Sequence, residues 1–325
     1  MKFFKCAAVT ILAALSCNAQ AQAKEFPTRA ITLIIPFPPG GSVDIVGRLV
    51  AEKMGAVLKQ PFVVENRTGA GGVVGASYVA RAKADGYTLL LGGPASFVQA
   101  PVLHPKLPYD PISSFEPVGQ ASNGPLVVVV DKNSKAKNLP MLIQELKAKG
   151  NNANYGSNGN GTLPHLTGDL FREAAHLDMV HVPYSGGPAV ITALLSGEVD
   201  MSIQNIPGVQ SMITAGRLRA LATTGNTRAG ALPDLPTLRE AGFKDFEANA
   251  WLGIFAPAHT PPAVVETLSK ALEDAIKDPD LRKRMLLTGD EAIYRTPKDF
   301  AAFVAKQALR WRPIIEQANV TSMNK

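Results

Sequence analysis

Residues 31–44 read ITLIIPFPPGGSVD, an apolar run that leads into a loop rich in proline and glycine. The apolar run is rich in β-branched residues, which predicts a strand over residues 31–35 buried on both faces of a parallel sheet. Ser42 is placed to cap a helix, and the helix has apolar residues at Val46, Val50, Met54 and Val57. The stretch therefore predicts a strand, a loop and a helix in succession.

Two further loops repeat this pattern: residues 68–72 (TGAGG) and residues 156–162 (GSNGNGT). A helix start carries unpaired N–H groups and roughly half a positive charge, so it attracts small anions. Three such loops in one chain predict a built pocket for a small anion. The alternative, that these glycines only form tight turns between strands and helices, stays open at this point.

The common nucleotide motifs fail in both of these loops. Residues 156–162 have the glycine spacing of a Walker A loop, but Thr162 stands in place of the lysine that binds phosphate. In the other loop, Gly69 and Gly71 begin a dinucleotide fingerprint, but Val74 occupies the third glycine position. The loops therefore do not predict an ATPase or a dinucleotide enzyme.

The first residues have the layout of a secretory signal peptide. Lys2 and Lys5 precede an apolar run over residues 7–15, and small and polar residues follow as far as Ala23. The run is roughly half of the ~20 residues that a membrane-spanning helix needs. A lipoprotein site at Cys17 would need a better lipobox than the preceding ALS. We expect cleavage after Ala23 and export to the periplasm.

Composition excludes several classes of function. Cys6 and Cys17 both lie in the predicted signal peptide, so the mature chain has no cysteine for disulfides, metal ligation or nucleophilic catalysis. Without Lys2 and Lys5 the chain has 31 basic and 27 acidic residues, with 6% aromatics and no basic run, which does not predict nucleic-acid binding. The five histidines have no metal-binding spacing, and no Gly-x-Ser-x-Gly elbow is present.

The remaining pattern predicts an α/β fold of two doubly wound domains. Domain one is expected over residues 24–123 and 247–325, and domain two over residues 124–246, after a signal peptide at residues 1–23. The further strands are expected at residues 62–64, 88–91, 126–130, 153–155, 179–182, 201–204, 218–222 and 248–257. The further helices are expected up to residue 80, at residues 139–148 and 163–174, after residue 188, after residue 236, and at residues 261–277, 279–287 and 297–318.

Several stretches together resemble one known family. They are residues 36–44 with Arg48, residues 65–72, residues 156–166, residues 182–186, residues 197–200 and residues 251–257. They are similar to the periplasmic solute-binding receptors of tripartite tricarboxylate transporters, the Bug family, over nearly the whole mature chain. Two departures are Thr68, where the family usually has proline, and Leu252, where an aromatic residue is common.

The resemblance implies a type II periplasmic binding protein, with two domains joined by a two-strand hinge and a ligand cleft between them. It implies a receptor that captures a small organic carboxylate and delivers it to membrane subunits of a transporter, as a monomer, without a cofactor, a metal or nucleic acid. The ligand carboxylate would lie on backbone N–H groups and hydroxyls, partly through water. Two alternatives are an exported sensory binding protein for a carboxylate and an exported α/β enzyme acting on an organic acid.

By the same resemblance, thirteen residues are candidates for ligand contact. Those of domain one are Phe37, Pro39, Gly40, Gly41, Asp44, Ala95 and Ser96. Those of domain two are Ser157, Gly161, Thr162, Tyr184, Ser185 and Gly186.

For several candidates a structural role is the alternative. Thr162 could bond the ligand or cap its own helix, and Ser157 and Ser185 could be contacts or turn residues. Asp44 could pair with the helix dipole and make a cap interaction, or it could contact the ligand directly and so select a ligand with an amine or hydroxyl. Tyr184 offers a flat face with a polar tip to a small acid.

Other side chains near the loops have mainly structural expectations. Phe37 and Phe97 could shape the pocket or belong to the core. Trp251 is expected to pack at the hinge, and His165 to brace the third loop. Arg48 and Arg67 are expected to be structural cations beside their loops, although either could reach an acid ligand.

Overall fold

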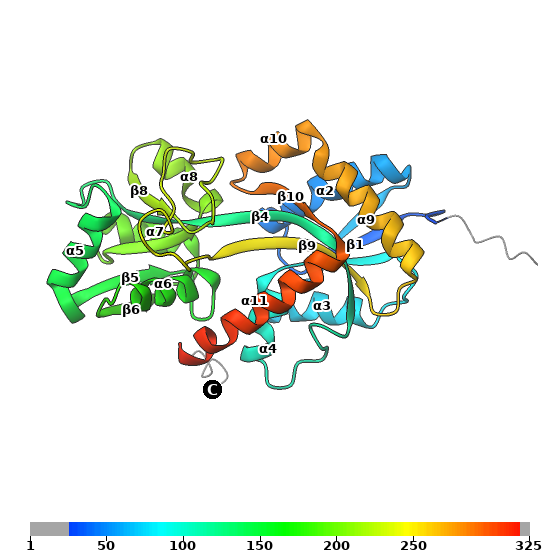
Figure 1. Ribbon diagram of the computed structural model, residues 1–325, viewed down its shortest axis with the longest axis horizontal. Coiled ribbons are helices and arrows are strands. Elements are labelled where there is room, and N and C mark those ends of the chain that lie inside the picture. The colour runs from blue at the N-terminus through cyan, green and yellow to red at the C-terminus, as the bar shows by residue number, and fades with distance from the viewer. Residues whose placement is uncertain (1–25, 319–325) are drawn as a thin grey trace, which may run out of the picture.

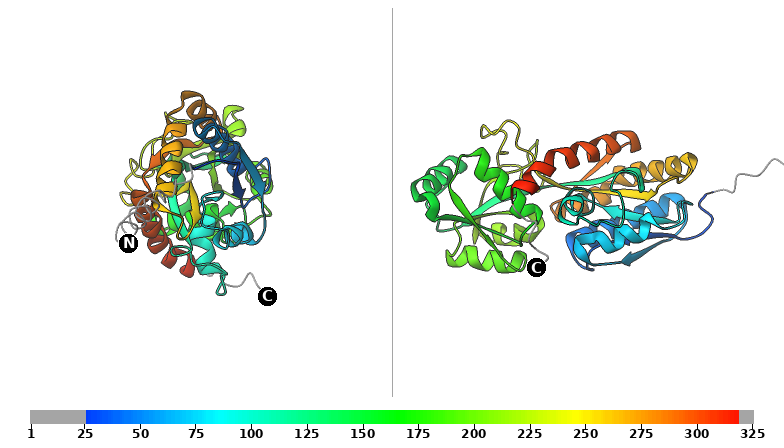
Figure 2. Two further views of the ribbon diagram at one scale, coloured as in Figure 1. Left: turned by 90° about the vertical axis from the view of Figure 1, so that its right-hand side faces the viewer. Right: turned by 90° about the horizontal axis from the view of Figure 1, so that it is seen from below.

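The computed structural model describes residues 26–318, which form two α/β lobes joined by two long strands (Figure 1). The view from below shows the same two lobes side by side, with the C-terminal helix lying over the first lobe and reaching the second lobe at its end (Figure 2). Within these residues, no helix is both long and apolar enough to cross a bilayer.

The first lobe contains both ends of the described chain. Its strands are β1 (Ile31–Ile35), β2 (Phe62–Asn66), β3 (Thr88–Gly92) and β10 (Glu291–Arg295). Its α-helices are α2 (Ser42–Leu58), α3 (Val73–Ala80), α4 (Ala100–Leu103), α9 (Pro262–Lys277), α10 (Pro279–Leu287) and α11 (Pro297–Gln317). A 3-10 turn, η1 (Ala70–Gly72), precedes α3, and a π-helical turn, η2 (Ala95–Gln99), precedes α4.

The second lobe is one continuous part of the chain. Its strands are β5 (Ala153–Ser157), β6 (Met179–Pro183), β7 (Met201–Asn205) and β8 (Leu218–Thr223). Its helices are α5 (Leu139–Lys149), the short η3 (Gly150–Asn152), α6 (Leu163–Ala174), α7 (Gly187–Ser196) and α8 (Ile206–Thr214).

Two strands run from one lobe to the other: β4 (Phe115–Asp131) and β9 (Asn249–Pro257). The strand order β2-β1-β3-β9-β4-β7-β5-β6 makes one mixed sheet, in which β10 and β8 also pair with β4. The antiparallel pairing of β4 with β9 ends at Pro125 and Asn249, and the pairing of β4 with β7 begins at the next residue, Leu126. The change of partner marks where the chain passes between the lobes.

The hydroxyl of Thr224 ties the two crossing strands together at this point. It accepts from the N–H of Leu126 at 2.8 Å and donates to the carbonyl of Ala248 at 2.5 Å. Thr224 is fully buried, so both bonds lie out of water. These bonds therefore join the two crossing segments at one point between the lobes.

The core follows from the apolar strands. Ile31, Leu33 and Ile35 of β1 face one core cluster, together with α2 and α9, while Ile34 faces another that continues into the second lobe. This alternation confirms that β1 is buried on both faces. Phe97 stacks on Phe255 with ring centroids 4.0 Å apart, so Phe97 belongs to the core.

Most expected elements are present, but several details of the prediction are wrong. Ser42 is the first residue of α2, and Gly41 stands at the cap without a side-chain hydrogen bond. The strand expected from residue 126 begins at Phe115, because it pairs first with β9. The helix expected after residue 236 is only a turn, and α8 and β10 were not predicted.

Candidate ligand-binding site

A cavity of about 400 Å³ lies where the two lobes meet the crossing strands. Its lining residues come from loops and helix starts of both lobes, from β4 and β9, and from the loop before β10. The first lobe contributes Phe37, Ser42, Val43, Gly71, Gly93, Pro94, Ala95, Gln99, Leu103, Gly289 and Asp290. The second contributes Asn158, Asn160, Gly161, Thr162, Leu163, Pro164, Asn205 and Pro207, and the crossing strands contribute Gly124, Pro125, Ala250, Trp251 and Leu252.

Three α-helices begin at the cavity wall. They are α2 with Ser42, α6 with Thr162 and Leu163, and α8 with Asn205. The first-turn N–H groups of a helix have no acceptor one turn earlier, and the helix dipole makes this end positive. The wall therefore offers hydrogen-bond donors and positive potential to an anion without a cationic side chain.

Side-chain amides add further polar groups to the wall. The side-chain oxygens of Asn158 and Asn205 are buried, and within residues 26–318 they have no hydrogen-bond partner. Asn160 and Gln99 also line the cavity. Because an amide both donates and accepts, and because buried polar groups are normally paired, these positions suit a polar ligand.

The described cavity wall carries no lysine, arginine or histidine, and its one ionisable side chain is Asp290. Hydrogen bonds from neutral groups would therefore have to hold a bound anion. Such bonds are strong where water is excluded, because the acceptor is charged.

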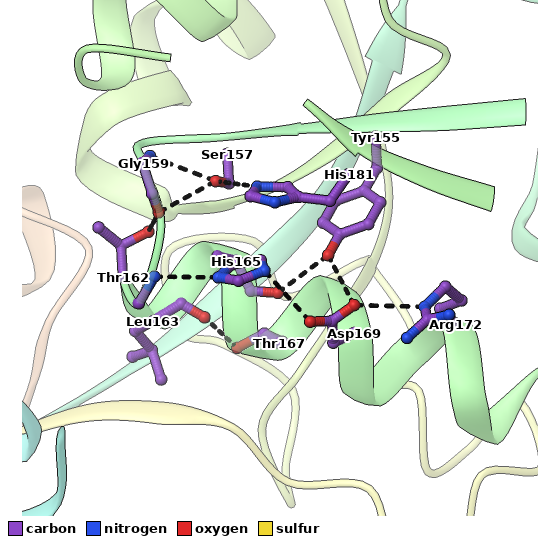
Figure 3. Close-up of polar contacts among 11 residues, drawn as sticks. Tyr155, Ser157, Gly159, Thr162, Leu163, His165, Thr167, Asp169, Arg172 and His181 are labelled. Carbon is purple, nitrogen blue, oxygen red and sulfur yellow. Dashed lines mark hydrogen bonds and ion pairs between the residues drawn. The ribbon is translucent and has the colours of Figure 1, made fainter. Parts of the chain in front are cut away.

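The third glycine loop is held by its own hydrogen bonds (Figure 3). The N–H of Gly161 donates to Nδ1 of His165 at 3.0 Å, and the hydroxyl of Thr162 donates to the carbonyl of Gly159 at 2.7 Å. Gly159 and Gly161 have φ of 121° and 73°, in the region that favours glycine. The loop shape thus depends on both glycines and on the imidazole of His165, which braces the loop as predicted.

A buried polar network fixes His165 in turn. Because Nδ1 of His165 accepts a hydrogen bond, its proton lies on Nε2, which faces Asp169 at 3.2 Å. Asp169 also accepts from the hydroxyl of Tyr155 at 2.9 Å. Burial raises the pKa of Asp169, but its bonds with His165 and Tyr155 and the charge of Arg172 outweigh burial and lower it. Asp169 therefore stays ionised and holds the His165 ring in place.

Ser157 and His181 form a close pair behind the loop, with Oγ and Nε2 2.6 Å apart (Figure 3). Ser157 is fully buried and is not on the cavity wall. The His181 ring stacks on His165 at 3.8 Å, and burial lowers the pKa of His181 to about 4. Within the described chain no carboxylate hydrogen-bonds to His181, so the pair lacks the third member of a catalytic triad.

Asp44 supports the first loop from behind. Its oxygens accept from the N–H of Gly40 at 2.9 Å, from Arg48 at 2.9 Å and from the amide of Asn66 at 2.8 Å. Burial raises the pKa of Asp44, but these three hydrogen bonds outweigh burial and lower it. Asp44 is 3% exposed and does not line the cavity, which favours the capping alternative.

Of the thirteen candidates, the structure places four on the cavity wall: Phe37, Ala95, Gly161 and Thr162. Ser96 is buried behind the wall, with no partner for its hydroxyl among the described residues. The other candidates off the wall, besides Asp44 and Ser157, are Pro39, Gly40, Gly41, Tyr184, Ser185 and Gly186.

Tyr184 has a contact of its own that explains its place. Its hydroxyl donates to Glu198 at 2.7 Å, and its ring lies against Gly156. Burial and this bond raise the pKa of Tyr184 to about 12. The side chain is therefore fixed to the second lobe, away from the cavity lining.

Arg48 and Arg67, which were expected to have structural roles, both bond to other protein groups beside their loops. Arg48 pairs with Asp44 and Asn66, and Arg67 pairs with Glu65 at 3.0 Å and lies 3.7 Å above the ring of Tyr78. Trp251 is 1% exposed and packs edge-on against Phe300, although it also reaches the cavity wall.

Sequence reasoning missed Asn158, Asn205 and Asp290. Asn158 lies inside a predicted loop. Asn205 ends an expected strand, and the proline two residues later, Pro207, is typical of the first turn of a helix. That signal could have revealed Asn205. Nothing local marks Asp290, which reaches the cavity only because β10 pairs with β4.

A two-lobed α/β chain with a cavity lined by helix starts and side-chain amides, beside two crossing strands, is a ligand-binding protein of the periplasmic binding protein fold. Residues 46–320 match the family described as tripartite tricarboxylate transporter family receptor. The chain is 35% identical to protein BugT of Bordetella pertussis over 303 residues, which cover 92% of each chain. This chain therefore belongs to the tripartite tricarboxylate transporter family receptors, as the sequence resemblance predicts.

Two solved structures of similar chains contain ligands. One is Rpa4515 of R. palustris with adipate, 30% identical with a TM-score of 0.78, and the match covers 91% of this chain and 99% of that one. The other is MatC of Rhodopseudomonas palustris with bound malate, 32% identical with a TM-score of 0.73, and the match covers 89% and 100%. Both ligands are dicarboxylates.

Proposed function

We propose that this chain is a periplasmic receptor that captures a small organic carboxylate and delivers it to the membrane subunits of a tripartite tricarboxylate-type transporter. One observation carries the proposal: three helix starts from both lobes line a cavity whose described wall has no cationic side chain. Family membership and the adipate and malate bound to two relatives support a carboxylate as ligand. The predicted signal peptide supports export, but it lies outside the described residues.

We propose that the ligand carboxylate lies against the starts of α2 and α6. Phe37, Ala95 and Thr162 would be among its contacts, with Asn158 and Asn205 added. The N–H of Gly161 is already bonded to His165, so the donors of α6 would be the N–H groups of Leu163 and His165. Pro164, between them, has no N–H.

We also propose that the lobes close on the ligand, with domain one at residues 24–123 and 247–325 and domain two at residues 124–246. The change of strand partner at Pro125 and Leu126 supports a hinge near residues 119–125 and 248–256. Pro39, Gly40 and Gly41 of the first loop and residues 184–186 lie off the wall, so they would reach a ligand only through such a movement.

The ligand is released unchanged in this proposal. The Ser157–His181 pair is the nearest approach to a catalytic group, but its serine is buried behind the wall and the lowered pKa of His181 makes it a weak base. Incubation of the mature protein with acids, followed by mass spectrometry of the acids, tests this. Multiple turnovers of any acid would contradict the receptor function.

Capture itself is tested by native mass spectrometry of gently purified mature protein, which should retain one small acid per chain. Calorimetric titration of ligand-free protein with succinate, malate, glutarate, adipate and citrate should then give one site for at least one acid. No bound acid and no heat with any of them would contradict the proposal.

A further inference from the structure

Asp290 is the one ionisable side chain on the cavity wall within residues 26–318. It ends the loop that follows α10, after Gly289, whose φ of 74° turns the chain toward β10. The residue is 7% exposed, although it borders the cavity. An acid therefore lies in the one place where the proposed function requires binding of an anion.

The carboxyl of Asp290 lies against the hinge strand. A Cβ added to Gly124 of β4 would come within 2.7 Å of its Oδ1, so the acid occupies the space that a side chain at position 124 would need. The hydroxyl of Ser122 lies beside the carboxyl but is buried without a hydrogen bond of good geometry among the described residues. The acid is thus fixed at the point where β4 leaves the first lobe.

No charged side chain of the described chain pairs with this carboxyl. On β10, which follows it, Glu291 bonds to the N–H of Gly230 and Arg295 bonds to Gln120. On α10, Arg284 pairs with Glu52 and Asp280, Asp280 also pairs with Lys53, and Arg282 and Lys283 are exposed. The elements packed against it bring only uncharged groups: Ser122 and Gly124 of β4, Ala250 and Leu252 of β9, and Asn205, Ile206 and Pro207 at the start of α8.

This environment favours the uncharged acid. Burial raises the pKa of Asp290 to about 7, against a smaller opposing effect of Ser122. A carboxylate bound in the same cavity would raise the pKa further, because two like charges at low dielectric cannot both persist. Two carboxyl groups in contact then share one proton.

We infer that Asp290 is a specificity-determining contact that donates a hydrogen bond, as an uncharged carboxylic acid, to one carboxylate of a dicarboxylate ligand. The inference rests on the proposed function. The other carboxylate lies at the helix starts, so the cavity holds two negative charges with neutral donors and one acidic proton. An O–H donor to a carboxylate gives a short, strong bond. Dicarboxylate capture is thereby coupled to the uptake of a proton.

The sign of the pH dependence follows from this coupling. At a pH below the pKa of Asp290 in the ligand-free protein, the side chain already carries the proton, so ligand binding takes up few protons from solution. Above that pKa each binding event must take up a proton, and the affinity falls as pH rises. With a pKa of about 7, affinity should fall about eightfold between pH 6.5 and 8.0. The ligand carboxylates stay ionised over this range.

The test is calorimetric titration at pH 6.5 and 8.0, in buffers of different ionisation enthalpy. The probes are succinate, malate, glutarate and adipate, with butyrate and hexanoate as monocarboxylates matched to succinate and adipate. Wild type should bind its best dicarboxylate about eightfold more weakly at pH 8.0, with nearly one proton taken up, while the monocarboxylates show no such change.

Three variants separate the role of the proton from that of the donor. Asp290→Asn keeps a donor but cannot titrate, so it should keep the affinity of wild type at pH 6.5 and lose the pH dependence. Asp290→Ala should weaken dicarboxylate binding tenfold or more at pH 6.5. Asp178→Asn, at an exposed position, is the matched control and should behave as wild type. Thermal unfolding of each variant verifies folding.

The outcomes that overturn the inference differ from those that overturn the function. Binding without pH dependence, or pH dependence that survives in Asp290→Asn, overturns the role of Asp290 alone. Binding that tightens at high pH overturns it also, and would indicate an ionised Asp290 facing an amine. If wild type binds none of the six acids at either pH, the carboxylate-receptor function fails for these acids and the inference fails with it.

Discussion

Nδ1 of His165 accepts the N–H of Gly161 across 3.0 Å, one turn into the helix whose start lines the cavity. Asp169 holds the opposite nitrogen of the same ring. The imidazole is therefore a neutral support inside the wall, and it occupies the N–H that the sequence pattern assigned to the ligand. The loop is shaped by this bond, while the donors left for an anion are those of the first turn of α6.

Gly161→Val should abolish most carboxylate affinity. Its φ of 73° is unfavourable for a β-branched residue, so the substitution would distort the loop and break the bond to His165. Calorimetric titration with the best-binding acid measures the loss. Gly216→Val, at φ 64° on an open turn after α8, is the control for backbone strain and should bind normally. Equal affinity in the two variants would contradict the role of the loop.

Thr162→Val should weaken binding by about 1 to 3 kcal/mol. The hydroxyl donates to the carbonyl of Gly159 at 2.7 Å, so its loss would loosen the loop that forms this part of the cavity wall. Thr162→Ser keeps the hydroxyl and should recover nearly all of the loss. If serine binds as weakly as valine, the methyl group and not the hydroxyl carries the effect.

Arg67→Gln should leave the affinity unchanged within about twofold and lower the free energy of unfolding by about 0.5 to 1 kcal/mol. The guanidinium pairs with Glu65 and stacks on Tyr78, outside the cavity wall. Titration and urea unfolding of the same preparation separate the two effects. Loss of binding in a folded Arg67→Gln protein would indicate an arginine clamp on the ligand.

Acidification should destabilise the protein partly through His181. Its pKa is lowered from 6.5 to about 4 on folding, so the unfolded chain binds a proton that the folded chain excludes as pH falls below 6.5. The stabilising contribution is complete above pH 6.5 and is lost progressively toward pH 4. Urea unfolding at pH 7.0 and 4.5 should show a smaller loss in His181→Gln than in wild type. An equal loss would place the pH dependence elsewhere.

Ligand binding should compact the molecule by closing the lobes about β4 and β9. Because Thr224 joins the two crossing strands at one point, rotation there can occur without separating these strands. Small-angle scattering of protein stripped of ligand by unfolding and refolding should show a smaller radius of gyration after the acid is added. An unchanged radius would contradict closure.

The sequence predicted those elements that local signals define. Helix α6 and helix α10 have the predicted bounds, because proline near each start and a clear apolar period leave little freedom. The helix expected after residue 236 shows the limit of such signals. Thr237 and Glu240 form reciprocal hydrogen bonds like those of a helix start, but Gly242, at φ 104°, turns the chain away after one turn.

The candidate site was predictable only in part for the same reason. A glycine loop that precedes an apolar helix is visible in the local sequence, and this pattern made Gly161 and Thr162 candidate ligand contacts. Asn205 and Asp290 lie more than 80 residues apart and meet at the cavity because β7 and β10 both pair with β4. Such a meeting depends on strand pairing across the whole chain, which no local pattern of residues encodes.

A crystal structure of the mature protein with its tightest-binding acid tests the central claim most directly. We expect one acid in the cavity between the lobes, with a carboxylate on the N–H groups at the start of α6 and no lysine, arginine or histidine side chain within hydrogen-bond distance. An acid bound outside this cavity, or held there by a cationic side chain, would contradict the account.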